Sequence, residues 1–192
     1  GLEVAGGGAL LDLGQALEYA GVSAKDAGID LERTVAMLGA LGDAGKIGSV
    51  AGTGLSGVLS GLQSGNKKQK SALRFLGINP ADKAGNLKPI EDLLAEMDKA
   101  LDKKFGKGKN GTRRAAFLEG LFGRESKEAA SILISKAGSG QLQKGIAGNN
   151  NAAGTAAAVA ATMSGNTVGM VKELDSAFEE LYLTGGGLLI PT

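Results

Sequence analysis

The chain has 192 residues, enough for one good-sized hydrophobic core or two small ones. It contains neither histidine nor cysteine, which excludes disulfides, thiolate metal sites, serine–histidine nucleophiles and nearly all zinc sites, so we expect no enzyme and no cofactor. With a net charge of +1, 43% hydrophobic residues, only 4% aromatic ones and 33 glycines, the composition favours short helices broken by glycine over one continuous rod.

The first 26 residues predict one helix and the start of another. Residues 4–9, VAGGGA, are expected to be flexible, and the apolar spacing that follows predicts a helix that ends at Gly21. Ser23 and Asp26 then have the spacing of a small capping box.

Residues 27–63 predict two amphipathic helices joined by a tight, glycine-rich turn. Asp30 is placed to cap the first helix. Gly42, Gly45 and Gly48 interrupt the helical pattern, and Ser49 is placed to cap the second helix. Two helices joined this tightly are expected to pack antiparallel. The apolar stripes are Leu31, Val35, Leu38 and Leu41 in the first helix, and Val50, Leu55, Val58, Leu59 and Leu62 in the second.

The middle of the chain predicts a basic loop over residues 64–70 and a short helix that ends at Gly77. Asn79 and Pro80 indicate a further helix start. Pro89 opens the clearest helix of the chain, which gives way to a glycine–lysine loop over 103–111. The stripe of this helix is Ile90, Leu93, Leu94, Met97 and Leu101.

The remaining third predicts four further elements. Thr112 is placed to cap a helix with Phe117 and Leu121 inside, and residues 125–138 predict another short helix. A polar joint at 148–154 then leads into two last helices, one alanine-rich over 155–163 and one amphipathic over 167–183. We find no strand by alternation and no internal repeat, so the predicted fold is all-α, either a helical bundle or an elongated helical array.

Charge is unevenly distributed along the chain. Residues 66–114 hold 13 basic and 6 acidic residues, whereas the segments before and after them are net acidic. This basic middle segment has two possible interpretations: it binds nucleic acid electrostatically, or it forms a solvated or protein-facing surface. The scarcity of aromatic residues within it favours the second interpretation.

The string GTGLSG, Gly52 to Gly57, matches the dinucleotide-binding pattern G-x-G-x-x-G. That pattern binds a pyrophosphate only after a strand and with an acidic residue about 20 positions further on. The preceding KIGSVA does not read as a strand, and residues 66–81 contain no acid. We therefore interpret these small residues as a thin helix face on which another helix packs closely.

The stretch GIDLERTVAMLGALGDAGKIGSVAGTGLSGVLSGL, residues 28–62, is followed in order by three further blocks, residues 72–97, 117–134 and 157–181. Together these blocks resemble the core region of the tape measure proteins of long-tailed bacteriophages and related phage-tail-like particles. In the family pattern an arginine often follows the leucine after the AGT triplet, whereas here Leu55 is followed by Ser56.

This resemblance implies structural work in tail assembly, tail-length determination and genome delivery. The implied location is the lumen of the tail tube in the virion, and the host cytoplasm during assembly. The implied partners are copies of the chain, the tail tube protein, tail assembly chaperones and baseplate or tip proteins, with contact to DNA or the host membrane at ejection and no small-molecule substrate. The motif expected to mediate helix packing or interaction comprises Gly48, Ser49, Ala51, Gly52, Thr53 and Leu55.

The alternative function is a membrane-active helical module that uses residues 155–163 together with the basic middle segment. For domains, we expect a helical core over 1–147, and an alanine-rich and C-terminal amphipathic part over 148–192 that continues from it. The chain begins without methionine, and we expect it to be a piece of a longer polypeptide. Even as one unbroken helix it would reach only about 290 Å, so any length-setting helices are expected outside it.

Overall fold

The computed structural model describes residues 3–63, 65–107 and 111–150. Within these ranges the chain forms eight α-helices and no strand, with one isolated antiparallel bridge between Ala81 and Leu87. The all-α prediction is therefore confirmed. The alanine-rich helix and the last amphipathic helix that the sequence predicts both lie outside the described residues.

The first helix, α1 (Glu3–Asp26), is longer than predicted. It includes the glycines of residues 4–9 and continues past Gly21, so the predicted end at Gly21 and the capping box at Ser23 are wrong. Ala20 and Ala24 are buried on either side of Gly21. Burial of an apolar face outweighs the small intrinsic penalty of a glycine inside a helix, which explains why the helix continues.

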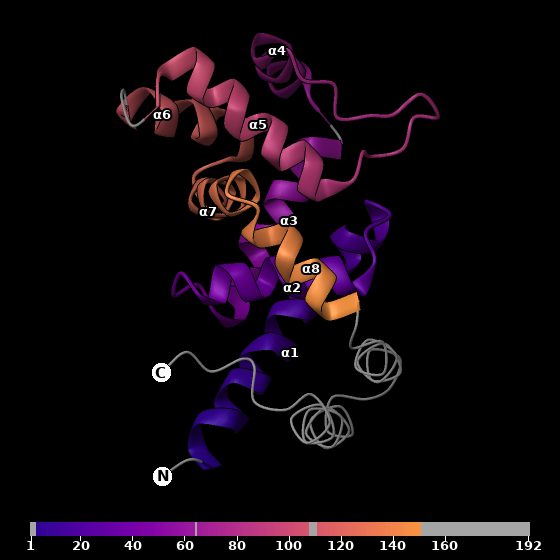
Figure 1. The fold of residues 1–192 in the computed structure, drawn as a ribbon, viewed down its shortest axis with the longest axis vertical. Helices are drawn as coiled ribbons and strands as arrows, with labels where there is room; N and C mark the ends of the chain where they lie inside the picture. The colour runs from indigo at the N-terminus through magenta and orange to yellow at the C-terminus, as the bar shows by residue number, and fades with distance from the viewer. Residues whose placement is uncertain (1–2, 64, 108–110, 151–192) are drawn as a thin grey trace.

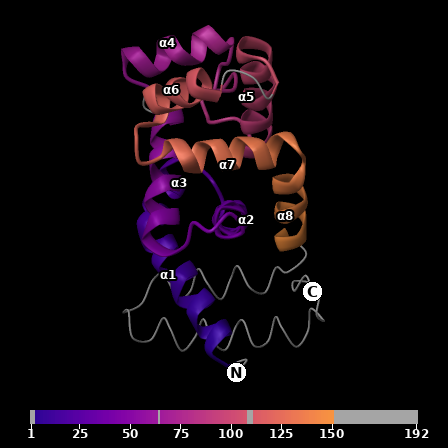
Figure 2. The same cartoon turned by 90° about the vertical axis from the view of Figure 1, so that its left-hand side faces the viewer.

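The next two helices are α2 (Leu31–Gly42) and α3 (Gly48–Gln63), as the sequence predicts. Asp30 caps α2 and accepts a hydrogen bond from the Arg33 backbone N–H at 2.8 Å. The predicted antiparallel packing is wrong, because α2 is seen end-on in Figure 2 while α3 runs along the vertical. Val50 is 60% exposed and does not belong to the buried stripe of α3.

The predicted basic loop over 64–70 is largely the beginning of α4 (Lys67–Leu76). Asn66 and Gln69 form a capping box there, which satisfies their backbone N–H groups and lets the helix begin within the basic stretch. Gly77 ends the helix in the left-handed conformation, with φ of 77°. No helix starts at Pro80, because the Asp82 carboxylate accepts hydrogen bonds from the backbone N–H groups of Ala84 and Asn86 and holds a turn.

Four more helices complete the described chain. They are α5 (Ile90–Phe105), α6 (Gly111–Phe122), α7 (Lys127–Gly138) and α8 (Gln141–Asn150). The predicted apolar stripe of α5 is fully buried. The sequence reading missed α8, whose residues Leu142 and Ile146 are buried in the core.

The helices are arranged around α3, which contacts α1, α2, α6 and α7. Figures 1 and 2 show α4, α5 and α6 gathered at one end of the long axis, whereas the N-terminal part of α1 extends past the other helices at the opposite end. In Figure 2, α7 crosses α3 and leads into α8. The core consists mainly of leucine and alanine side chains, which suits close helix packing.

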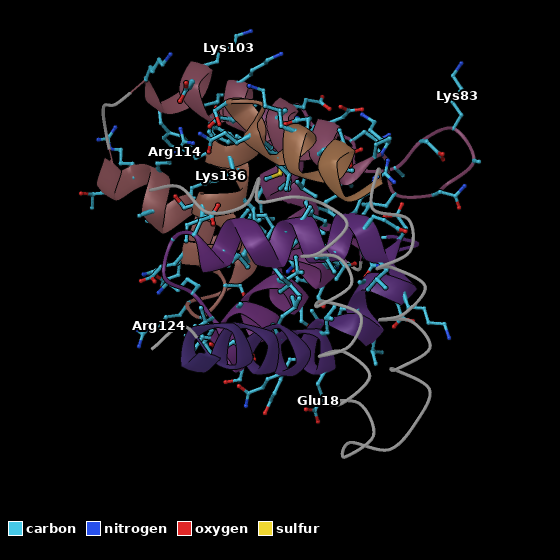
Figure 3. All side chains as sticks on the ribbon, turned by 60° about the horizontal axis from the view of Figure 1, so that its bottom comes forward. Glu18, Lys83, Lys103, Arg114, Arg124 and Lys136 are labelled. Atoms are coloured by element: carbon cyan, nitrogen blue, oxygen red, sulfur yellow. The ribbon has the colours of Figure 1, made fainter. Side chains whose placement is uncertain are left out.

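Two partly exposed arginines join neighbouring helices. Arg33 of α2 holds the Glu91 carboxylate of α5 with both ends of its guanidinium, at 3.0 Å from Nε and 2.9 Å from Nη2. Glu91 thereby raises the pKa of Arg33 further above its ordinary value. Arg114 of α6 bridges Asp98 and Asp102, one turn apart on α5, at 2.8 and 2.7 Å, and Figure 3 shows it close to the ribbons rather than extended into solvent.

Two glutamates tie α7 to its neighbours and predict a dependence of stability on pH. Lys127 lowers the pKa of Glu119, and Lys46 lowers the pKa of Glu128. Both folded-state values lie below the ordinary 4.5, so the stabilisation is present above pH 4.5 and is lost as the pH falls through the folded-state values. We expect Glu119→Gln/Glu128→Gln to lower the melting temperature at pH 7 but to change it much less at pH 3. Thermal unfolding followed by circular dichroism measures both, and equal loss at the two pH values would contradict the expectation.

Candidate functional site

The glycines of α3 lie on two different faces of the helix. Gly48 and Gly52 face α1, whereas Gly54, Gly57 and Gly61 face α6, α7 and the turn between them. We call these two contacts the α1 seam and the α7 seam. The sequence predicted one thin face, and the structure shows that α3 is thin on two.

In the α1 seam the two helices run parallel, because residue numbers rise together on both helices from one contact to the next. Gln15 accepts a hydrogen bond from the Ser49 backbone N–H at 3.3 Å, and the hydroxyls of Ser23 and Ser56 lie 2.6 Å apart. Between these two contacts, a Cβ on Gly52 would collide with the backbone oxygen of Ala16 and lie 2.7 Å from the Cβ of Tyr19. The α1 backbone therefore occupies the space of the missing side chain.

The α7 seam uses the other face of α3. A Cβ on Gly54 would lie 2.8 Å from the Cβ of Ala129, and one on Gly57 would lie 2.8 Å from the Cβ of Ser126. A Cβ on Gly61 would meet the ring of Phe122 at 2.8 Å. All three distances are shorter than side chains tolerate, so α3 packs closely on both sides at once.

The six residues of the predicted motif are distributed over α3 as follows. Gly48 and Gly52 form the α1 seam, Ala51 and Leu55 are buried in the core, and Thr53 is partly exposed. Ser49 does not cap the helix, because α3 begins one residue earlier and the side chain of Gln15 binds the Ser49 N–H. Ser56, which stands where the family pattern often has arginine, contacts Ser23 in the α1 seam.

The glycine fingerprint from Gly52 to Gly57 lies inside α3 rather than at its start. Backbone N–H groups in the middle of a helix already bond to carbonyls of the preceding turn, so they are not free to hold a pyrophosphate. Among the described residues there is no group of three or more acidic side chains arranged to hold a metal ion. Among the residues that the structure describes, no helix is long and apolar enough to cross a membrane.

Sequence reasoning missed the partner of α3. The chain order suggested α2, its neighbour in sequence, whereas the most extensive contact is with α1. The available signal was the pair of glycines four residues apart, Gly48 and Gly52, because residues at that spacing share one helix face.

A pair of glycine substitutions tests the α1 seam. We expect Gly52→Ala to lower the free energy of unfolding by about 1–3 kcal/mol, because the added methyl group forces α1 and α3 apart. Gly39 of α2 has no atom within 4 Å of an added Cβ, so Gly39→Ala is the matched control and should gain about 0.5–1 kcal/mol. Urea unfolding of both variants measures the difference, and an equally tolerated Gly52→Ala would refute the seam.

Comparison with known proteins identifies the family. The family model described as "Phage-related minor tail protein" matches residues 4–123, which run from α1 into the turn after α6. The chain is 39% identical to the "Probable tape measure protein" of Escherichia phage P2 over 168 residues, which are 87% of this chain and 20% of that protein. It is 30% identical to the "Tape measure protein" of Pneumococcus phage Dp-1 over 180 residues, 94% of this chain and 15% of that protein.

The chain spans about a fifth or less of the length of these curated relatives. No solved structure matches it. The family match covers more than half of the chain, and both relatives carry the tape measure name that the sequence blocks had suggested. The chain therefore belongs to the phage-related minor tail protein family, as a helical segment of the tape measure type.

Proposed function

We propose that this chain is a folded structural segment of a tape measure protein that acts in tail assembly and length determination and in genome delivery. The observation that carries the proposal is the family match over residues 4–123, the region that contains the α1 seam and the Arg33–Glu91 and Arg114 contacts. These features make a defined tertiary structure, which fits an assembly component.

The segment is not itself the ruler in this proposal. One continuous helix of this length would reach about 290 Å, whereas the described chain folds back on itself through eight helices. The relatives are at least about five times longer than the matched region, which leaves room for length-setting helices elsewhere in the parent polypeptide.

The proposed location is the lumen of the tail tube in the virion, with the host cytoplasm as the site of assembly. The proposed partners are copies of the chain, the tail tube protein, tail assembly chaperones and baseplate or tip proteins, with contact to DNA or the host membrane at ejection. A structural family, together with a chain that lacks histidine and cysteine, supports a non-enzymatic role without a small-molecule substrate.

Two in-frame deletions in the parent polypeptide of the tail-forming particle test this proposal. The first removes residues 31–122, which comprise α2 to α6, and the second removes an equally long stretch of continuous predicted helix elsewhere. We expect the second deletion to shorten tails by about 140 Å, at 1.5 Å per residue. The first should instead reduce the yield of complete tails, because it removes a folded unit.

Tail lengths and tail numbers are measured by negative-stain electron microscopy. Normal tails at normal yield after the first deletion would refute a structural role for this segment. A shortening by about 140 Å after the first deletion would show that the segment itself sets length, which the proposal denies.

A further inference from the structure

The C-terminal halves of α4 and α5 form a basic surface. A shallow cavity of about 470 Å³ lies between them. We call this surface the α4–α5 basic face; the side chains that define it are those of Arg74, Phe75, Lys99, Lys103 and Lys104. Figure 3 shows Lys103 extending away from the helices at one edge of the molecule, with Glu18 of α1 at the opposite edge.

The cations of this face differ from the other basic residues in their partners. Arg33 and Arg114 each hold carboxylates of neighbouring helices. Arg74, Lys99 and Lys103, in contrast, form no ion pair with any residue that the structure describes. The acidic residue in the cavity wall, Glu96, already contacts Lys88 at 3.4 Å. Like charges gathered without counter-charges leave a positive potential that an anionic partner neutralises.

An exposed aromatic ring lies beside these cations. Phe75 is 51% exposed, although its ring contacts those of Phe117 and Phe105 at centroid distances of 5.8 and 6.3 Å. The ammonium group of Lys104 lies 4.7 Å from the centre of the Phe75 ring. Phosphates of a nucleic acid duplex would use the cations and leave this ring in water. An acidic amphipathic helix would cover both, because it carries carboxylates beside an apolar stripe.

The same chain contains a segment with this chemistry. Residues 168–182 lie outside the described part of the structure, and their sequence has Lys172 as its only basic residue. The sequence predicts one apolar stripe there, comprising Val168, Val171, Leu174, Phe178, Leu181 and Tyr182. Its acidic residues are Glu173, Asp175, Glu179 and Glu180.

The connecting chain is long enough for this segment to reach the face. With residues 155–163 in the predicted helix, residues 151–167 span up to about 40 Å, of which about 14 Å is helix and about 28 Å is extended chain. A compact domain of about 150 residues has a radius of gyration near 15 Å, so this reach is more than twice that radius. We propose that residues 168–182 dock on the α4–α5 basic face of their own chain, with carboxylates on Lys99 and Lys103 and an apolar side chain against Phe75. The proposal does not depend on the tail function proposed above.

Zero-length cross-linking of the complete chain tests the contact. A carbodiimide joins lysine amines to carboxylates that already touch, and peptide mass spectrometry identifies the pairs. At low micromolar concentration we expect links from Lys99, Lys103 or Lys104 to Glu179 or Glu180 within a monomer. The absence of such links, or links found only in covalent dimers, would overturn the proposal.

A charge exchange separates a specific contact from general attraction. We expect docking to slow the proteolysis of residues 168–182 in the unaltered chain. Lys99→Glu/Lys103→Glu should remove this protection, and Glu179→Lys/Glu180→Lys should remove it equally. With all four substitutions together, the cleavage rate should return to within about twofold of that of the unaltered chain, because opposite charges again face each other. Limited proteolysis with chymotrypsin, which cleaves at Phe178 and Tyr182, measures the rate.

The control variant is Lys67→Glu/Lys68→Glu, which changes the net charge equally at exposed positions in the first turn of α4, outside the cavity wall. It should keep the protection. Far-UV circular dichroism shows whether each variant keeps its helices. Equal loss of protection in the control, or no restoration in the exchanged variant, would overturn the proposal. So would binding of a 20-base-pair duplex that depends on Lys99 and Lys103 but leaves the protection of residues 168–182 unchanged.

Discussion

The close approach of α1 and α3 is the contact on which the described fold depends most. Gly52 presents no side chain to α1, so the backbone oxygen of Ala16 occupies the space where a Cβ would stand. Such an approach lets small residues gain van der Waals contact that longer side chains would prevent. Because α3 is also thin on its α7 face, one helix joins the N-terminal part of the chain to α6 and α7. A core poor in aromatic residues can therefore still be closely packed.

Ion pairs between helices complement this packing. Arg33 ties the start of α2 to the start of α5, and Arg114 ties α6 to two carboxylates of α5. These pairs are partly exposed, so each adds little stability but fixes one geometry. Small side chains and partly exposed ion pairs together hold a defined shape.

The glycines of α3 show what a local sequence pattern can predict and what it cannot. The string from Gly52 to Gly57 matched a nucleotide fingerprint, and the lack of a preceding strand was enough to reject that chemistry from the sequence. The same glycines indicated close packing, but not the identity of the neighbours. Gly52 faces α1 and Gly54 faces α7 because those helices happen to lie there, which depends on the whole path of the chain.

The sequence by itself determined the helical class, the Asp30 cap, the end of α4 at Gly77 and the buried stripe of α5, because each depends on residues within a few positions of one another. Its ordered blocks also determined the family. Only the tertiary structure decided that α1 continues past Gly21, that α2 crosses α3, and that α1 is the main partner of α3. Those outcomes depend on burial against residues more than 30 positions away. The spacing of apolar and small residues shows which face of a helix is packed, but not which distant helix packs on it.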